Sequence, residues 1–230
     1  MKTLGLIGGT SWESTLDYYR LLNQGVRTRR GGLHSCPMAL SSVDFAPLAA
    51  LMRAGDWDAL GARLAIEARR LEGAGAEAIV LCTNTMHKRA ADIVAAVDVP
   101  FIDIRDVCGA AVKASGARAP LLLGTRYTMA DPFFNDVLKD RFGLYALVPS
   151  HADQALVDRV IFEELCDGIV SPASREAYLR VVAASPDADS VIFGCTEIGM
   201  LLDASACGKP VFDNLRLHVA AALDFALGTP

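Results

Sequence analysis

The stretch LGLIGGTSWEST, residues 4–15, sets the pattern on which the rest of the chain is read. Leu4–Ile7 is a short apolar run, Gly8 and Gly9 follow it, and a segment of helical period begins at Trp12. An apolar run that ends in glycines and leads into a helix is typical of a buried strand in a parallel sheet. The stretch therefore predicts a strand–turn–helix unit of the α/β class.

The same alternation continues through all 230 residues. Short apolar runs predict strands at 4–7, 38–45, 78–81, 99–104, 120–123, 144–148, 190–193 and 210–212. Stretches of helical period predict helices at 12–28, 57–73, 90–97, 132–142, 154–167, 174–184, 201–206 and 215–227. This order predicts an α/β fold of parallel sheets with helices on both faces.

The two halves of the chain repeat one another. Thr10 precedes Cys82 as Thr125 precedes Cys195, at nearly the same spacing, and each threonine follows a glycine. Pro100 and Pro210 then open matched apolar segments, each with an aspartate three residues later. These matches in the same order predict two pseudo-symmetric α/β domains, and the boundary between them is expected near residues 115–119.

The composition excludes several classes of protein. The formal net charge of −5 is spread along the chain without a basic stripe, so neither nucleic acid nor a membrane surface is an expected partner. Six cysteines without a CxxC pair are too few for a disulfide scaffold. No apolar run reaches the length of about 20 residues that spans a membrane, and the first apolar run is too short for a signal peptide. A cytoplasmic protein with reduced thiols is expected.

Two of the six cysteines stand out from the others. Cys82 and Cys195 each follow a predicted buried strand and open a helix, one in each half of the chain. The carboxyl ends of parallel strands are where α/β proteins bind ligands, and a helix N-terminus favours thiolate. Two such thiols suggest two-base inversion at carbon, in which one takes a proton and the other delivers one. The other cysteines are interpreted as filler: Cys36, Cys108, Cys166 and Cys207.

Four segments carry a resemblance to a known family: GLIGGTSWEST (5–15), VLCTNTMHK (80–88), LLGTRYTM (122–129) and FGCTEIG (193–199). Together they resemble the aspartate/glutamate racemase family along essentially the whole chain. The resemblance implies a pyridoxal-independent amino-acid racemase that uses no cofactor and no metal, acts on a small amino-acid substrate and forms a homodimer. It implies a first domain of residues 1–115 completed by a C-terminal helix at 214–230, a second domain of residues 116–213, and a site in the cleft between them.

The resemblance also assigns roles to single residues. Cys82 and Cys195 become the acid/base pair. The remaining positions are expected to hold the substrate's α-amino and α-carboxylate groups or to line the same cavity: Thr10, Asn84, Thr85, Thr125, Thr128 and Thr196. Glu197 is expected either to orient the substrate ammonium or to serve as an acidic group favoured at a helix N-terminus. His87 is either a partner that stabilises thiolate or a residue that caps or covers a helix face.

One departure from the family bears on the substrate. Relatives specific for aspartate need a cation for the side-chain carboxylate, and the resemblance leads us to expect a lysine directly before Gly168. Asp167 stands there instead, and the segment after the second strand has no basic residue before Arg53, so Arg53 and Arg126 are the available substitutes. Aspartate remains the nominal substrate, and the departure favours a broad specificity that includes neutral or hydroxylated amino acids.

Other functions fit the same motifs. Hydantoin racemases and maleate isomerases resemble this chain and also use paired cysteines. A non-catalytic module that binds a small molecule is the alternative of a different class, although a binding protein has no need of two reactive thiols. The sequence GLIGGT is only a partial dinucleotide fingerprint, and the pairs His34/Cys36 and Cys82/His87 lack further metal ligands.

Overall fold

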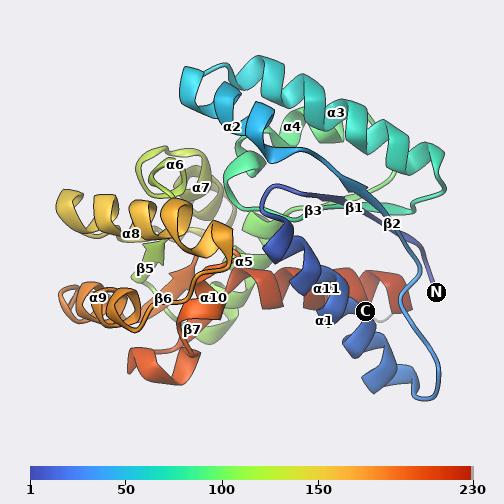
Figure 1. Cartoon of the computed structure of the whole chain (residues 1–230). Helices are drawn as coiled ribbons and strands as arrows, with labels where there is room; N and C mark the ends of the chain where they lie inside the picture. The colour runs from blue at the N-terminus through green and yellow to red at the C-terminus, as the bar shows by residue number, and fades with distance from the viewer. Residues whose placement is uncertain (229–230) are drawn as a thin grey trace. The chain divides into compact units, whose positions relative to one another are not determined.

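The computed structural model describes residues 1–228 (Figure 1). The chain forms two compact units. Unit 1 consists of Met1–Asp103 together with the C-terminal segment from His218, and unit 2 consists of Ile104–Leu217. The chain therefore passes from unit 1 to unit 2 after Asp103 and returns after Leu217.

Unit 1 is built on a parallel sheet with the strand order β2-β1-β3-β4. Its strands are β1 (Leu4–Gly8), β2 (Met38–Ser42), β3 (Ala78–Leu81) and β4 (Phe101–Ile102). Every residue of β1 and β3 is buried, as expected for central strands that are covered on both faces. β4 is shorter than the predicted strand at 99–104 because the Glu72 carboxylate accepts the backbone N–H of Val99, at 3.1 Å, and α5 begins at Ile104.

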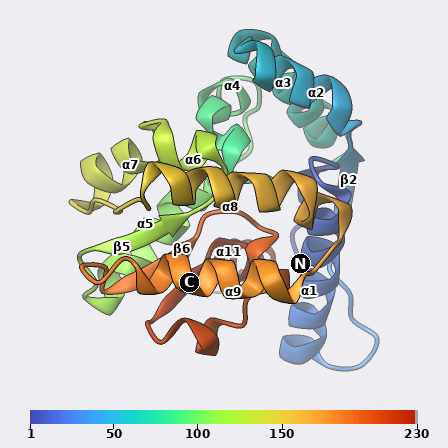
Figure 2. The ribbon, with the colours of Figure 1, turned by 60° about the vertical axis from the view of Figure 1, so that its left-hand side comes forward.

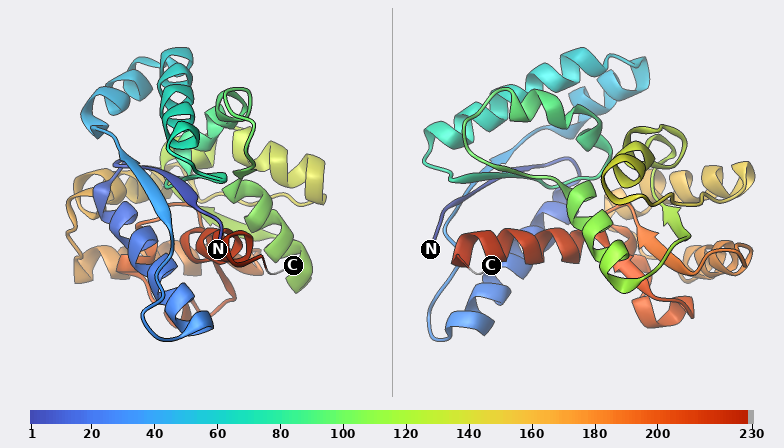
Figure 3. Two further views of the ribbon diagram at one scale, coloured as in Figure 1. Left: turned by 90° about the vertical axis from the view of Figure 1, so that its right-hand side faces the viewer. Right: turned by 180° about the vertical axis from the view of Figure 1, so that it is seen from behind.

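Helices cover both faces of this sheet. They are α1 (Trp12–Arg30), α2 (Phe45–Ala54), α3 (Trp57–Gly73), the 3-10 turn η1 (Thr85–Arg89), α4 (Ala90–Val94) and the part of α11 (Asn214–Leu227) from His218 onward. α3 packs on one face through a buried stripe, while α1 and α11 lie side by side on the other (Figure 3). Gly25 permits that second packing, since a Cβ there would meet the Leu223 side chain. α2 was not predicted: Asp44 caps its N-terminus and so ends the strand expected to reach residue 45.

Unit 2 contains a parallel sheet of β5 (Pro120–Leu123), β6 (Ser190–Phe193) and β7 (Val211–Asp213), in that order. Successive residues of β5 enter two different cores. Leu121 and Leu123 pack with the core that α8 and α9 complete, and Leu122 packs with the core that α5 completes. The sheet is therefore buried on both faces, and Figure 2 shows α8 and α9 lying side by side over one of them.

The helical segments of unit 2 are α5 (Ile104–Ser115), α6 (Arg126–Ala130), α7 (Phe133–Val137), the π-helical turn η2 (Leu138–Phe142), α8 (His151–Glu163), the 3-10 turn η3 (Leu165–Asp167), α9 (Pro172–Ala183), α10 (Ile198–Leu201), the 3-10 turn η4 (Ala204–Cys207) and the start of α11. The predicted strand at 144–148 is reduced to one bridge between Leu147 and Leu121. The Asn135 side chain explains this, because it donates to and accepts from the backbone of Ala146 and so replaces a strand partner.

The units do not divide where the sequence led us to expect. The expected boundary at 115/116 assigned α5 to the first domain, whereas the structure includes it in unit 2. Cys108 and Val112 of α5 belong to the same core as Leu122, and a Cβ on Gly109 would meet the Phe142 ring. The C-terminal segment expected at 214–230 divides as well, since α11 begins in unit 2 and continues in unit 1. Residues 229–230 of that segment lie outside the described residues.

No helix within residues 1–228 combines the length and the apolar character needed to cross a membrane.

Candidate active site

In unit 1 the residues singled out by sequence gather where β1 and β3 end. Cys82 directly follows β3, and its backbone N–H donates to the Ile7 carbonyl of β1 at 2.9 Å. The turn that carries Thr10 and the turn that carries Cys82 therefore leave neighbouring strands at the same edge of the sheet. Cys82, Asn84 and Thr85 are all buried there.

The turn after β1 has an unusual backbone. Gly9 and Ser11 both have φ near +85°, and Ser11 is the one non-glycine residue of the described chain with positive φ. Only glycine fits at position 9, because a Cβ there would meet the Val43 carbonyl. The Gly9 N–H donates to Thr15 Oγ1 at 2.9 Å, which fastens the turn to α1. Within residues 1–228 the buried Thr10 hydroxyl makes no hydrogen bond, so this polar atom is available to a ligand.

The Cys82 thiol lies in a neutral environment. Burial alone raises its pKa far above the usual range, and the short 3-10 turn that follows does not reverse this effect. His87 does not approach the thiol as a hydrogen-bond partner. Its Nδ1 lies instead 2.7 Å from the carbonyl oxygen of Thr83, the residue next to Cys82. Cys82 is therefore protonated in this state, and no neighbouring charge within residues 1–228 stabilises its thiolate.

In unit 2 the second cysteine has a carboxylate beside it. Cys195 Sγ donates to Glu197 Oε2 at 2.8 Å, and Thr196 Oγ1 donates to the same oxygen at 3.0 Å. All three residues are buried. Burial raises the pKa of Cys195 most, and the negative charge of Glu197 raises it further. The sequence led us to expect Glu197 to orient the substrate ammonium or to be an acidic group at a helix N-terminus, and the structure adds that its carboxylate accepts a hydrogen bond from the Cys195 thiol.

The paired threonines lie beside this cysteine. Thr125 caps α6, its Oγ1 lies 3.2 Å from Thr128 Oγ1, and both hydroxyls are buried. They follow β5, the neighbour of the strand that leads to Cys195. Gly124 lets these two strand ends approach closely, since a Cβ there would lie 2.8 Å from the Gly194 carbonyl oxygen. Unit 2 therefore presents two hydroxyls, a thiol and a carboxylate at one sheet edge.

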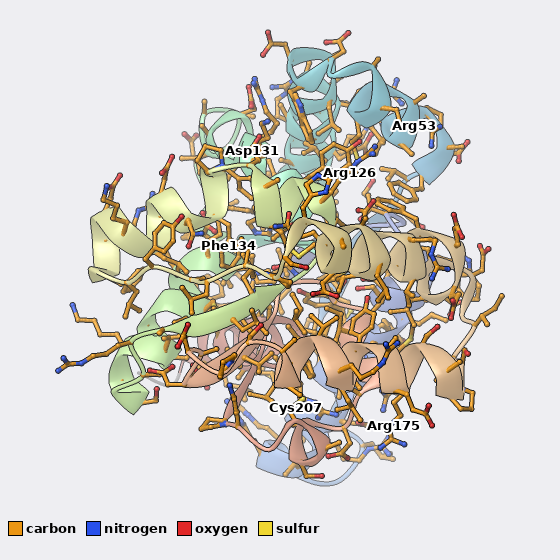
Figure 4. The ribbon with its side chains drawn as sticks, turned by 90° about the vertical axis from the view of Figure 1, so that its left-hand side faces the viewer. Arg53, Arg126, Asp131, Phe134, Arg175 and Cys207 are labelled. Atoms are coloured by element: carbon orange, nitrogen blue, oxygen red, sulfur yellow. The ribbon has the colours of Figure 1, made fainter. Side chains whose placement is uncertain are left out.

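The basic residues considered for the substrate's side chain are engaged or exposed. Arg126 is labelled beside α8 in Figure 4, and its guanidinium is 58% exposed. It donates to the Tyr127 hydroxyl at 3.0 Å, lies over the Tyr127 ring, and is 4.0 Å from Asp158. Arg53, in the last turn of α2, is exposed. Asp167, where a lysine was expected, is exposed in η3.

The structure brings the predicted residues together in two sets, one in each unit. The first set is Thr10, Cys82, Asn84 and Thr85, and the second is Thr125, Thr128, Cys195, Thr196 and Glu197. Sequence analysis missed that Cys166 lies near the second set. Burial, and then the negative charge of Glu197, raise the pKa of Cys166 to about 12. Among residues 1–228, no group of three or more His, Cys, Asp or Glu side chains is arranged to hold a metal ion.

Comparison with known proteins identifies the family. A sequence model of the Asp/Glu/hydantoin racemase family matches residues 7–222. The chain belongs to this racemase family. It is accordingly an isomerase of the racemase class, with the two-domain α/β fold of Asp/Glu racemases.

Three solved structures extend the likeness to the fold. A candidate Asp/Glu racemase from Yersinia pestis is 47% identical, with a TM-score of 0.90 over 99% of this chain and 100% of that one. An aspartate racemase homologue from Pyrococcus horikoshii is 30% identical, with a TM-score of 0.85 over 99% of this chain and 100% of that one. The aspartate racemase of Picrophilus torridus, at 20% identity and a TM-score of 0.81 over 98% and 94% of the two chains, shares the fold.

Proposed function

We propose that the protein is a cofactor-independent amino-acid racemase that moves the Cα proton between Cys82 and Cys195. One observation carries the proposal. In each unit a buried cysteine follows the strand that pairs with the first strand of the repeat. Cys82 follows β3, which pairs with β1, and Cys195 follows β6, which pairs with β5. Buried thiols in matched positions of two repeats suit a reaction in which a proton leaves one face of a carbon and another arrives at the opposite face.

The proton steps balance without an outside reactant. Glu197 first takes the thiol proton of Cys195 along the existing 2.8 Å hydrogen bond, which leaves a thiolate and a carboxylic acid. The thiolate removes the Cα proton of one enantiomer, and the electron pair of the broken C–H bond spreads into the substrate carboxylate. The Cys82 thiol then protonates the opposite face of Cα. The enzyme ends with a Cys195 thiol, a protonated Glu197 and a Cys82 thiolate. This is the form that converts the other enantiomer, and return of the Glu197 proton to Cys82 through solvent restores the starting state.

The hydroxyl groups supply the binding part of the proposal. The carboxylate gains negative charge as the Cα proton leaves, so donors aimed at it lower the barrier. Thr125 and Thr128 place two buried hydroxyls within 3.2 Å of each other, a spacing suited to one carboxylate. Asn84, Thr85 and Thr196 complete the proposed cradle. The Thr10 hydroxyl, which has no partner within residues 1–228, contributes to it from the turn after β1.

For the substrate we propose a broad set that includes neutral and hydroxylated amino acids. A second carboxylate needs a cation, because an unpaired buried charge is very costly. Arg126 is stacked on Tyr127, Arg53 is exposed, and Glu197 places negative charge beside Cys195. Aspartate stays the nominal substrate of the family and is the reference in the assay below.

The deciding experiment incubates the purified protein with single L- and D-amino acids in D₂O. It follows both the inversion of configuration and the uptake of deuterium at Cα. We expect inversion with one deuterium incorporated, at rates for homoserine, methionine or leucine that match or exceed the rate for aspartate. A protein that turns over aspartate far faster than these contradicts the broad specificity, and a protein that exchanges no Cα proton contradicts the racemase mechanism.

Hydantoin racemisation is the second candidate, because the matched family includes hydantoin racemases. The same assay with a 5-substituted hydantoin distinguishes the two, since the enzyme must prefer one class of substrate over the other. The homodimer implied by the family resemblance also stays a prediction, and sedimentation velocity of the purified protein tests it.

A further inference from the structure

A buried polar network occupies the side of unit 1 where α11 packs. The Tyr18 hydroxyl of α1 lies 2.7 Å from His218 Nδ1, although the two residues are 200 positions apart in the chain. His218 Nε2 lies 2.7 Å from the Ile102 carbonyl oxygen of β4. Both side chains are fully buried. The imidazole of His218 therefore joins α1, β4 and α11.

The protonation pattern of this network is fixed by its partners. The Ile102 carbonyl can only accept, so His218 Nε2 carries the hydrogen, and Nδ1 accepts from the Tyr18 hydroxyl. Burial lowers the pKa of His218 to about 4, which keeps the ring neutral at pH 7, while the Ile102 carbonyl and the negative charge of Asp103 oppose that shift. The network is a neutral, directional chain of hydrogen bonds in the low-dielectric interior.

A second histidine connects this network to the turn that carries Cys82. The rings of His218 and His87 meet edge to face, with centroids 5.8 Å apart. Phe101 of β4 packs against His87 as well, at 5.3 Å between centroids. His87 Nδ1 in turn donates to the carbonyl oxygen of Thr83 at 2.7 Å. The residue next to Cys82 is therefore held by a ring that packs against both His218 and Phe101.

The Cys82 thiol needs such support more than Cys195 does. Within residues 1–228, no side-chain hydrogen bond to Cys82 Sγ is found, whereas Cys195 Sγ is oriented by Glu197 at 2.8 Å. The position of the Cys82 thiol therefore depends on where the backbone of its turn places the side chain, without a hydrogen bond from the described part of the chain to Sγ that would orient it. A shift of about 1 Å in a reacting group is enough to slow catalysis about a hundredfold.

We propose that His218 is a positioning residue for Cys82, acting through His87 on the carbonyl of Thr83, with Tyr18 and Ile102 holding the His218 ring in place. This inference rests on the proposed role of Cys82 in proton transfer. In this proposal neither histidine takes or delivers a proton. Their function is to hold the Cys82 turn in the geometry in which its thiol addresses one face of Cα.

The test compares His218→Phe with Tyr18→Phe. The first keeps a ring and removes both hydrogen bonds, and the second removes a single hydroxyl. In each variant, the rates at which iodoacetamide alkylates Cys82 and Cys195 are measured separately by peptide mass spectrometry, alongside kcat and KM for racemisation. We expect the Cys82 alkylation rate to change about tenfold in His218→Phe and less in Tyr18→Phe, while the Cys195 rate stays within twofold. kcat should fall by a similar factor with KM nearly unchanged.

Tyr178→Phe is the matched control. Tyr178 is also fully buried, and its hydroxyl donates to the Val157 carbonyl at 2.9 Å, but it belongs to unit 2. This variant should leave the alkylation rate of Cys82 unchanged. His218→Gln, whose amide can still donate to the Ile102 carbonyl, should recover part of the wild-type rate.

The proposal is overturned if the variants alter both cysteines equally, or if Cys82 reacts at its wild-type rate in a folded His218→Phe protein. Should His218→Phe fail to fold, Tyr18→Phe decides by the same comparison. Alkylation needs no substrate, so it reports on Cys82 even in a protein that has no racemase activity. A selective effect at Cys82 in such a protein would contradict the proposed function and leave this inference standing.

Discussion

The turns that carry Cys82 and Cys195 follow corresponding strands of two repeats, yet the chain supports the two thiols by different means. Cys195 donates to a carboxylate two residues away, at 2.8 Å. Cys82 lies in a turn held by an imidazole ring, since His87 Nδ1 donates to the carbonyl oxygen of Thr83. Burial raises the pKa of both thiols, and only at Cys195 does a neighbouring negative charge raise the pKa further.

In the proposed mechanism, this difference separates the two tasks of the acid/base pair. There Glu197 accepts the proton of Cys195, so this thiol can become a thiolate without solvent. Cys82 has no such acceptor in its turn and is suited to start as the proton donor. Racemisation runs in both directions, yet the groups that surround the two thiols need not be the same.

The largest effect is expected from removing either thiol. Cys82→Ser and Cys195→Ser should each lower the racemisation rate about a thousandfold or more, because a hydroxyl does not replace a thiolate as a base. The remaining cysteine should still exchange the Cα proton of one enantiomer with deuterium from D₂O, and the enantiomer should differ between the two variants. Cys207→Ala, which removes a buried thiol outside both sets, is the control. Unchanged racemisation in either serine variant refutes the two-base mechanism.

The neutral network of unit 1 predicts a pH-dependent stability. The pKa of His218 is about 4 in the fold and about 6.5 in the unfolded chain, so the unfolded state binds more protons between these values. The free energy of unfolding should fall by about 3 kcal/mol as the pH drops from about 7 to below 4, apart from the contributions of other groups.

Urea unfolding at pH 7 and pH 5 measures this effect, with His218→Phe expected to show a weaker dependence on pH. His34→Gln changes an exposed histidine and should keep the wild-type dependence. Equal slopes in wild type and His218→Phe contradict the assignment.

Replacing the carboxylate of unit 2 should move two observables in opposite directions. Glu197→Gln removes a negative charge beside Cys195, so the pKa of that thiol should fall and iodoacetamide should alkylate it faster at pH 7. Racemisation should nevertheless slow about ten- to hundredfold, because the proton acceptor is gone. If alkylation and racemisation rise together, Glu197 does not accept the proton.

A smaller change, in substrate preference, is expected from a substitution at Asp167, where the family resemblance led us to expect a lysine. Asp167→Lys should raise the ratio of kcat/KM for aspartate to kcat/KM for homoserine by a few fold, since it brings a cation to an exposed position near the second set. Glu163→Lys makes the same charge change at an exposed position of α8 and serves as the control. A ratio that moves equally in both variants shows an effect of net charge alone.

Reagents that remove a carbonyl cofactor or a metal ion should leave the racemisation rate unchanged. The rate after treatment with aminooxyacetate or with EDTA, followed by dialysis, should match that of untreated enzyme. If the treatment abolishes activity, and pyridoxal phosphate or a divalent metal restores it, then the thiol pair does not act alone.

The sequence predicted those parts of the fold in which the local residue pattern is compatible with only one type of secondary structure. The strands at 78–81, 120–123 and 190–193 and the helix at 57–73 have their predicted bounds, because a fully buried strand or a four-residue apolar stripe is visible locally. α5 was missed although Ile104, Cys108 and Val112 repeat at helical spacing and are buried. The strand at 144–148 was wrong because its backbone partner is a side chain, Asn135.

For the candidate site, the matched order of motifs singled out both cysteines and the threonines around them, and the structure buries these residues in two sets. The bond from Cys195 to Glu197 depends on how a side chain turns within the loop, which two-residue spacing leaves open. Tyr18 and His218 could not be connected at all, since they are 200 positions apart and nothing in the sequence indicates that these two side chains meet.

The return of the chain at His218 has a consequence for synthesis on the ribosome. Unit 2 is continuous, so all of its residues are available once Leu217 has left the exit tunnel. Unit 1 is translated first and yet lacks the partner of Tyr18 and Ile102 until the final helix emerges. The order of translation is therefore the reverse of the order in which the two units can be completed, and the nascent first half must wait with one face of its sheet covered only by α1.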